Sequence, residues 1–230
     1  MAKNQVKRTA STEEFLEAVR AGDLAQVKAL LEASPSLANA KSESGLSPIL
    51  VALYFGHHQV AALSASRKAD LDIHEASSLG EIERVKYLVE GDPSLASSYS
   101  VDGYTPLALA AYLGQKETVQ FLISKGADVN AIAKNESRFT ALTGAVSSGH
   151  RAIVELLLTG GADPNHRYEE GITPLFAAAA NGDPKMIELL LARGADASVK
   201  TPKGQTALSI ALEKGHNNVA GLLRRHGAAT

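Results

Sequence analysis

The stretch "DGYTPLALAAYLGQKETVQFLISKGADVNA", residues 102–131, is the most informative part of this sequence about its fold. Its two apolar segments are separated by Gly114 and followed by a second glycine, Gly126. The hydroxyl of Thr105 can cap a helix. Pro106 at the first helical position loses no hydrogen bond, because an amide there has no partner within the helix. A glycine takes the left-handed conformation that ends a helix at little steric cost. The stretch therefore predicts a turn, two short helices and a loop.

The two predicted helices are too short to be stable alone. Each has about ten residues or fewer, whereas isolated helices are marginal in water below roughly 12 to 15 residues. The first carries the small residues Ala110 and Ala111 on one face, and the second carries Val119, Leu122 and Ile123. We therefore expect each helix pair to be stabilised by a neighbouring pair that covers its apolar face.

The same pattern returns along the chain. "GADVN" at 126–130 is followed by "GADPN" at 161–165, "GADAS" at 194–198 and "GAA" at 227–229, at spacings of 33 to 35 residues. Copies of the Thr-Pro-Leu helix start recur in phase at Ser47, Thr105, Thr140, Thr173 and Thr206. The glycine between the helices recurs at Gly22, Gly56, Gly80, Gly114, Gly149, Gly182 and Gly215. These positions predict seven helix pairs.

A turn followed by two antiparallel helices, repeated over about 33 residues, resembles the ankyrin repeat family. The resemblance covers residues 11–230, and "DPSLA" at 92–96, echoed as "SPSLA" at 33–37, is similar to stand-alone ankyrin repeat proteins of bacteria. It implies an all-α ankyrin-repeat solenoid of about seven helix-turn-helix units with short β-turn fingers and an irregular third repeat.

This interpretation divides the chain into a flexible, polar N-terminal tail, residues 1–10, and one ankyrin repeat domain, residues 11–230. The expected repeats span approximately residues 11–41, 42–71, 72–99, 100–132, 133–167, 168–200 and 201–230.

Three departures from the repeat pattern stand out. The interval between Gly56 and Gly80 is short, which predicts a weak joint near residues 64–72 that is either tolerated drift or a functional hinge or ligand notch. After it, Asp72 and Glu75 can form a capping box at the next helix start. Two extra residues lengthen the turn around residues 133–138. The histidine that the family has after Thr-Pro-Leu is replaced by Leu50, Ala108, Thr143, Phe176 and Ser209.

Composition argues against several classes of protein. The chain has no cysteine, which rules out disulfides and thiolate metal sites and fits a cytoplasmic location. No apolar run approaches the roughly 20 residues of a membrane span. The net charge of −2, with basic and acidic residues intermixed, lacks the basic stripe of a nucleic-acid-binding protein.

We expect no enzyme activity, cofactor or metal site. The chain has no GxSxG, HExxH or phosphate-binding loop motif. His57, His150 and His216 follow the repeat glycines and are interpreted as structural residues. The recurring aspartates Asp128, Asp163 and Asp196 are interpreted as loop caps.

What remains is a binding surface. In the ankyrin family, partners dock on the concave face formed by the turns and the exposed ends of the first helices, and large aromatic residues there can anchor a protein partner. The expected contact residues are Leu46, Tyr54, Phe55, Leu79, Tyr104, Tyr112, Leu113, Phe139 and Ile172. Three alternatives stay open: these side chains pack between repeats, they join copies of the chain into a homo-oligomer, or a small-molecule or enzymatic site lies at residues 64–72.

Overall fold

The computed structural model describes residues 10–228, and over this part of the chain every regular segment is helical. Its β pairing there is limited to one bridge between Tyr168 and Ile172, so the expected all-α fold is confirmed. Of the expected N-terminal tail, residues 1–9 lie outside the described part, and Ala10 is the first residue of helix α1. Within residues 10–228, no helix combines the length and the apolar character that a bilayer span requires.

The chain divides into two compact units, Met1–Glu75 and Ala76–Thr230, next to the predicted joint. The first holds α1 (Ala10–Ala21), α2 (Leu24–Ala33), the short 3-10 helix η1 (Pro35–Asn39), α3 (Pro48–Tyr54) and α4 (His58–Ser66). The division falls inside α5 (Ile73–Leu79). The second unit continues with α6 (Ile82–Gly91), η2 (Pro93–Ser97), α7 (Pro106–Tyr112), α8 (Lys116–Ser124), α9 (Ala141–Ser147), α10 (Arg151–Thr159), α11 (Pro174–Asn181), α12 (Pro184–Ala192), α13 (Ala207–Glu213) and α14 (Asn217–Arg225).

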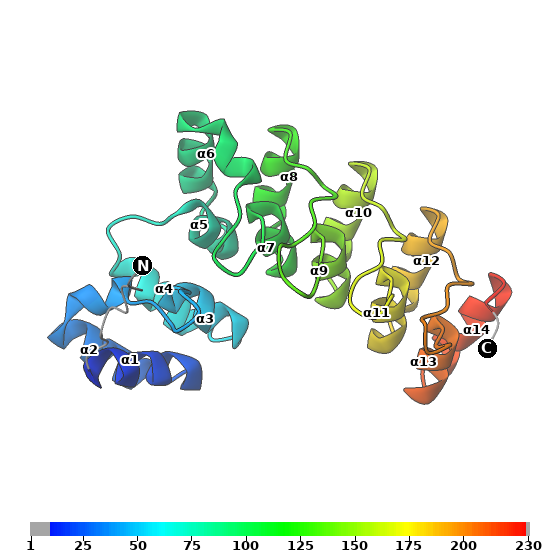
Figure 1. Cartoon of the computed structure of the whole chain (residues 1–230), viewed down its shortest axis with the longest axis horizontal. Coiled ribbons are helices and arrows are strands. Elements are labelled where there is room, and N and C mark those ends of the chain that lie inside the picture. The colour runs from blue at the N-terminus through cyan, green and yellow to red at the C-terminus, as the bar shows by residue number, and fades with distance from the viewer. Residues whose placement is uncertain (1–9, 229–230) are drawn as a thin grey trace, which may run out of the picture. The chain divides into compact units, whose positions relative to one another are not determined.

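The helices of the second unit form two rows (Figure 1). The inner helices α7, α9, α11 and α13 pack side by side, and each contacts the outer helix that follows it: α8, α10, α12 or α14. A leucine is fully or almost fully buried at the second position of every inner helix and in the last turns of every outer helix. These leucines are Leu107, Leu142, Leu175 and Leu208, and Leu122, Leu157, Leu190 and Leu223. Burying each side chain contributes about 1.5–3 kcal/mol, which is what holds such short helices in place.

The first unit uses the same arrangement on a smaller scale. Helix α1 packs against α2 and α3, α3 packs against α4, and α2 packs against α4. Phe15, Val27, Leu31 and Ile49 are completely buried among these helices. Ile49 occupies the second position of α3, where the inner helices of the second unit have leucine.

The two ends of α7 follow the sequence prediction, whereas Thr173 before α11 makes no side-chain capping bond. The Thr105 hydroxyl accepts a hydrogen bond from the Ala108 amide at 3.2 Å, and Gly114 has a φ of 82° after α7. At α13, Thr206 and Ser209 form a reciprocal capping box, because Ser209 stands where the family has histidine. At this position the missing imidazole is thus replaced by a local hydroxyl contact.

The side chain just before an outer helix often hydrogen-bonds to a backbone carbonyl in the preceding helix pair. That carbonyl belongs to the last or next-to-last residue of the inner helix of that pair. Each imidazole uses Nε2, which must carry the proton because a carbonyl oxygen only accepts. The bonds join His57 to Arg20 at 2.9 Å, His150 to Tyr112 at 3.1 Å, His216 to Ala180 at 3.1 Å and the Gln115 amide to Ser78 at 3.1 Å. The structural interpretation of the three histidines is therefore confirmed.

The predicted joint is tied to the start of α5. The Glu75 amide donates to the Asp72 carboxylate at 2.9 Å, and the Asp72 amide donates to Glu75 at 3.1 Å, which confirms the predicted capping box. The Lys68 Nζ lies 2.6 and 2.5 Å from the two carboxylate oxygens of Glu75. In α4, the Ser64 hydroxyl is buried without a hydrogen-bond partner. The corresponding position of the other outer helices is a leucine, so its surroundings are apolar.

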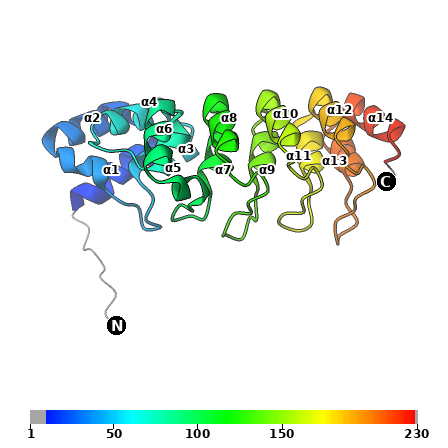
Figure 2. The ribbon, with the colours of Figure 1, turned by 90° about the horizontal axis from the view of Figure 1, so that it is seen from above.

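Each inner helix from α7 to α13 is preceded by a turn that we call a finger, and the fingers of this unit project from the same side (Figure 2). They span residues 100–104, 133–139, 168–172 and 201–205, and the first unit has one at 42–46. A backbone hydrogen bond of 2.8–3.0 Å from the first residue to the last closes each finger. The finger 133–139 is two residues longer than the others, as predicted from the sequence.

Gly103 is the finger position with the least space for a side chain. Its φ is 86°, and a Cβ atom there would lie 2.9 Å from the Lys134 carbonyl carbon of the next finger. The Gly103 carbonyl oxygen also accepts a hydrogen bond from the Lys134 amide at 2.8 Å. Gly204 has a similar φ of 79° but has no atom within 4 Å of such a Cβ.

Replacing His150 with alanine should lower the free energy of unfolding by about 1–2 kcal/mol, because the Tyr112 carbonyl loses its donor. His150→Gln should recover part of this loss, since Gln115 makes the same bond one helix pair earlier. Urea unfolding followed by circular dichroism measures both. An alanine variant as stable as the wild type would show that the bond contributes nothing.

Gly103→Ala should destabilise the protein by at least about 1 kcal/mol more than Gly204→Ala. Both variants place a side chain on left-handed backbone, but only the first drives it into the neighbouring finger. Thermal unfolding of the two variants checks this difference, and equal losses would contradict the packing of fingers 100–104 and 133–139.

Candidate functional site

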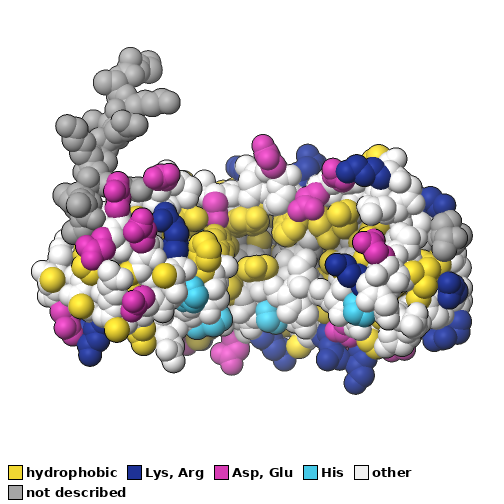
Figure 3. All heavy atoms as spheres, turned by 90° about the horizontal axis from the view of Figure 1, so that it is seen from below, with side chains coloured by type: hydrophobic (Ala, Val, Ile, Leu, Met, Phe, Trp, Pro, Cys, Tyr) yellow, Lys and Arg dark blue, Asp and Glu magenta, His cyan; other side chains and the backbone are white. Residues whose placement is uncertain are grey.

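The inner helices and fingers of the second unit form one face, which we call the inner face. Figure 3 shows hydrophobic side chains gathered over this face of the second unit, with charged side chains toward its finger edge. Five of the predicted contact residues belong to its inner helices and fingers: Tyr104, Tyr112, Leu113, Phe139 and Ile172. A sixth, Leu79, ends α5 in the same unit and is half-buried.

The predicted finger residues do not lie at the finger tips. Leu46, Tyr104, Phe139 and Ile172 are the last residues of their fingers, and their carbonyl oxygens accept the closing hydrogen bond. All four are half-buried. The side chain at the tip of finger 100–104 is Val101, which is 65% exposed and was not singled out from the sequence.

The fingers 100–104 and 133–139 are joined by several hydrogen bonds. The Asn135 side-chain amide donates to the Asp102 carbonyl at 2.7 Å, and the Tyr104 hydroxyl lies 3.3 Å from the Ser137 hydroxyl. Just before the first finger, the Tyr99 ring lies 3.9 Å from the Lys134 ammonium. Tyr104 is therefore held between two fingers and cannot turn freely into solvent.

The next pair of fingers is joined through rings and an imidazole. Phe139 packs edge-on against Tyr168 with ring centroids 4.9 Å apart, and the His166 Nε2 donates to the Arg138 carbonyl at 2.8 Å. Tyr168 is buried, and this burial, with the nearby Glu169 carboxylate, raises the pKa of its hydroxyl well above the usual value. Tyr168 therefore stays neutral and serves as a packing residue.

Asparagine side chains connect the loops that precede the fingers. Asn130 donates to the Gly161 carbonyl at 3.0 Å and accepts from the Asp163 amide at 2.8 Å. Asn165 repeats both bonds one unit later, with Gly194 and Asp196. The last two fingers are linked by the Lys203–Glu170 ion pair at 2.6 Å. The fingers of the second unit thus form a continuous, cross-linked row.

The recurring aspartates are loop caps, as predicted. Asp128, Asp163 and Asp196 accept hydrogen bonds from the amides two residues later, Asn130, Asn165 and Ser198, at 2.8–2.9 Å. The Ser198 hydroxyl and amide hold the pKa of Asp196 below its usual range. Among residues 10–228, no three His, Asp or Glu side chains are grouped as metal ligands.

Tyr112 is the most exposed of the predicted residues in the second unit. It ends α7 with 40% of its surface exposed. A Cβ atom on Gly144 of α9 would lie 3.3 Å from the Tyr112 Cβ, so the two helices approach closely here. The Tyr112 carbonyl accepts the His150 bond described above. The backbone that carries this aromatic side chain is therefore fixed by α9 and by the residue that precedes α10.

The first unit carries the other predicted contact residues. Phe55 follows α3 with 58% of its surface exposed, and its ring stacks on the His57 ring at a centroid distance of 6.3 Å. Tyr54 and Leu46 are half-buried. All three residues belong to the first unit and are therefore considered apart from those of the second.

Several residues that shape the inner face carry no periodic signal in the sequence. Tyr99, Asn135 and Tyr168 act through contacts with the next finger, and a pattern within one repeat does not reveal such contacts. Asn130 and Asn165 recur at the repeat spacing after the Gly-Ala-Asp triplets, so periodicity alone could have found that pair.

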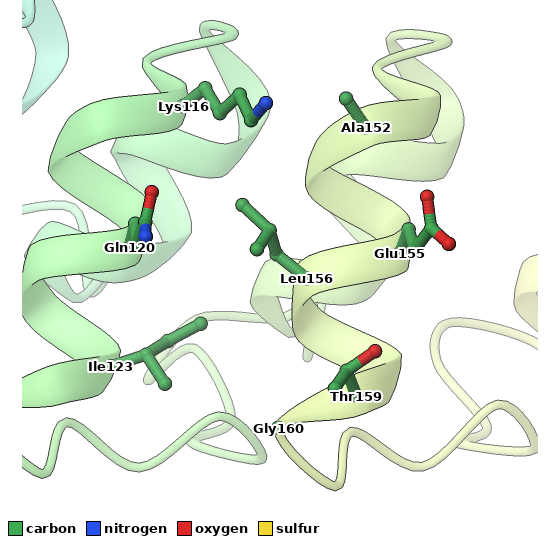
Figure 4. Close-up of a pocket in the computed structure, with 8 residues that line it drawn as sticks. All are labelled: Lys116, Gln120, Ile123, Ala152, Glu155, Leu156, Thr159 and Gly160. Carbon is green, nitrogen blue, oxygen red and sulfur yellow. The ribbon is translucent and has the colours of Figure 1, made fainter.

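A groove of about 460 Å³ lies on the opposite side, between the outer helices α8 and α10 (Figure 4). Ile123 and Leu156 point toward each other across it, with Lys116 and Glu155 at its edges. Its exposed lining is mainly apolar, which is the ordinary consequence of two helices diverging at their surface. The groove lacks the convergent polar groups of a ligand site.

Comparison with known proteins agrees with this architecture. The family model described as ankyrin repeats (3 copies) matches residues 73–168 and 142–230. The chain is 40% identical over 104 residues to ankyrin repeat and SAM domain-containing protein 6 of Rattus norvegicus, covering 44% of this chain and 11% of that protein. It is 40% identical over 93 residues to NAD-capped RNA hydrolase NUDT12 of Homo sapiens, covering 40% of this chain and 20% of that protein.

A third relative is ankyrin repeat and KH domain-containing protein mask of Drosophila melanogaster, 33% identical over 126 residues, or 55% of this chain and 2% of that protein. The chain thus spans a fifth or less of the length of each of these relatives. The repeat model matches more than half of this chain, and the structure has the stacked helix pairs and the turns in phase. This chain therefore belongs to the ankyrin repeat family.

Proposed function

We propose that this protein is a non-catalytic recognition module that binds a protein partner on the inner face of its second unit. Ankyrin repeats generally mediate binding between proteins and are generally non-catalytic. The proposed contacts are Leu79, Tyr104, Tyr112, Leu113, Phe139 and Ile172. No cofactor or nucleic acid is part of the proposal, and we propose a cytoplasmic location.

The main support for this proposal is the exposure of the Tyr112 side chain at the end of α7. An aromatic ring that is 40% exposed offers a large contact area, and a partner gains most when that ring is already held in place. The close approach of Gly144 and the His150 hydrogen bond fix the backbone from which Tyr112 projects. The cross-linked fingers beside it lower the entropy cost of binding in the same way.

The first unit offers a second, separate contact surface in the proposal. Phe55 is more exposed than Tyr112, and its stacking on His57 limits the conformations of its ring. Leu46 and Tyr54 complete this surface. Each surface is to be tested on its own unit.

There are two alternatives to a protein partner on these surfaces. The exposed rings of Phe55 and Tyr112 also suit self-association, in which a second copy covers them. A small-molecule or enzymatic site at residues 64–72 is less favoured, because Lys68 in this segment is already engaged by Glu75.

Tyr112→Ala should weaken binding of the partner by more than about 1 kcal/mol, roughly five-fold in Kd, because an anchoring ring is lost. Tyr87→Ala is the matched control: Tyr87 is 69% exposed on the outer helix α6, and its loss should leave affinity unchanged. Phe55→Ala tests the first unit in the same way. The partner is captured from source-cell extract, purified and titrated by calorimetry.

The contradicting outcome is unchanged affinity for Tyr112→Ala and Phe55→Ala, with circular dichroism showing an intact fold. Light scattering over a range of concentrations distinguishes the self-association alternative. A mass that rises with concentration, and that Tyr112→Ala or Phe55→Ala returns to that of a monomer, would identify a second copy as the occupant.

A further inference from the structure

One residue at the finger row departs from the pattern of all the other fingers. The residue just before the last one has left-handed backbone in every finger described. In four fingers it is a glycine, Gly45, Gly103, Gly171 or Gly204, with φ between 79° and 86°. In the long finger 133–139 it is Arg138, with a φ of 54°.

Arginine at this position destabilises the turn. Glycine adopts left-handed backbone readily, whereas a residue with a Cβ atom is strained there. The turn itself needs only the backbone of Arg138: its amide donates to the Asn135 carbonyl, and its carbonyl accepts from His166. A glycine could make both bonds, so the arginine side chain is not required to form the finger.

The Arg138 side chain is exposed and has no ion-pair or hydrogen-bond partner within residues 10–228. Other cations of the finger row are engaged: Lys203 pairs with Glu170, Arg167 donates to the Lys200 carbonyl at 3.4 Å, and Lys134 lies over the Tyr99 ring. Strained residues are retained chiefly where function requires them. The guanidinium of Arg138 is therefore available to a ligand, and the presence of this residue on left-handed backbone has a cost in stability.

We propose that Arg138 is a specificity-determining contact of the inner face and binds a single carboxylate of the protein partner. This inference rests on the proposed function and adds the chemistry of the ligand. A guanidinium pairs with a carboxylate through two parallel hydrogen bonds. Phe139, the next residue, is half-buried against Tyr168 and offers apolar surface beside the charge.

Charge on the same fingers restricts this ligand further. Glu136 lies two residues before Arg138 in the long finger, and Glu169 lies in the next finger; both are exposed. They repel additional carboxylates. The favoured partner segment therefore carries one Asp or Glu next to a large apolar residue, and not an acidic run.

The first test measures stability without any partner. Arg138→Gly should raise the midpoint of thermal unfolding by a few degrees, because the strain is relieved. Glu169→Gly is the control, since within residues 10–228 Glu169 is the other non-glycine residue with positive φ, at 45°. An Arg138→Gly midpoint equal to or below that of the wild type overturns the argument from strain and with it the proposal.

The second test uses short random peptides displayed on phage and selected on the folded wild-type chain. We expect the enriched peptides to share one acidic residue beside a large apolar one. Arg138→Gly should weaken the best peptide at least roughly five-fold. Lys185→Ala, which removes an exposed charge from the outer helix α12, should not. Arg138→Glu should restore affinity for the same peptide with its acid changed to lysine.

The outcomes separate this proposal from the proposed function. One outcome is that peptides bind Arg138→Gly as well as the wild type yet lose affinity for Tyr112→Ala. That outcome supports binding on the inner face and overturns the role of Arg138. Enriched peptides without a shared acidic residue, or no enriched peptide at all, overturn the role of Arg138 as well.

Discussion

The fold depends on the burial of apolar helix faces between successive helix pairs. Within residues 10–228 no helix has more than 12 residues, which is too short to be stable alone against the cost of helix nucleation. The leucines repeated at the second position of the inner helices and near the end of the outer helices supply the missing free energy. Since each pair contacts only its neighbours, stability is a sum over interfaces, and an interruption between pairs divides the chain. In the sequence, the boundary between the two compact units falls in α5, a few residues after the shortened repeat.

Hydrogen bonds between pairs add precision to this apolar stacking. Apolar contacts alone tolerate sliding, whereas the bonds of His57, His150 and His216 to carbonyls of the preceding pair have one geometry. Asn130, Asn165 and the fingers do the same on the other side of the second unit. These bonds position Tyr112 and Tyr104. A surface whose rings are already ordered loses little entropy on binding, which is the physical basis of the proposed recognition function.

The finger row also shows where this chain gives up stability. Most of its left-handed positions are glycine, the residue that takes this conformation most readily, but Arg138 and Glu169 are not. Both lie beside the packed rings of Phe139 and Tyr168. The fold gains nothing at Arg138 that glycine would lack, which is why the proposed ligand contact is placed on its side chain.

The helix pairs, their capping residues, the lengthened finger and the shortened repeat can all be predicted from the sequence. These features follow from local rules: Thr105 and Gly114 act on their own backbone, and Asp72 and Glu75 cap their own helix. Which of the predicted contact residues are exposed becomes clear only from the packing of the folded chain. Tyr104 and Phe139 are half-buried and contact the next finger, and Tyr99 and Tyr168 act through neighbours about one repeat away. Packing between repeats sets these exposures, and the period of a repeat does not encode them.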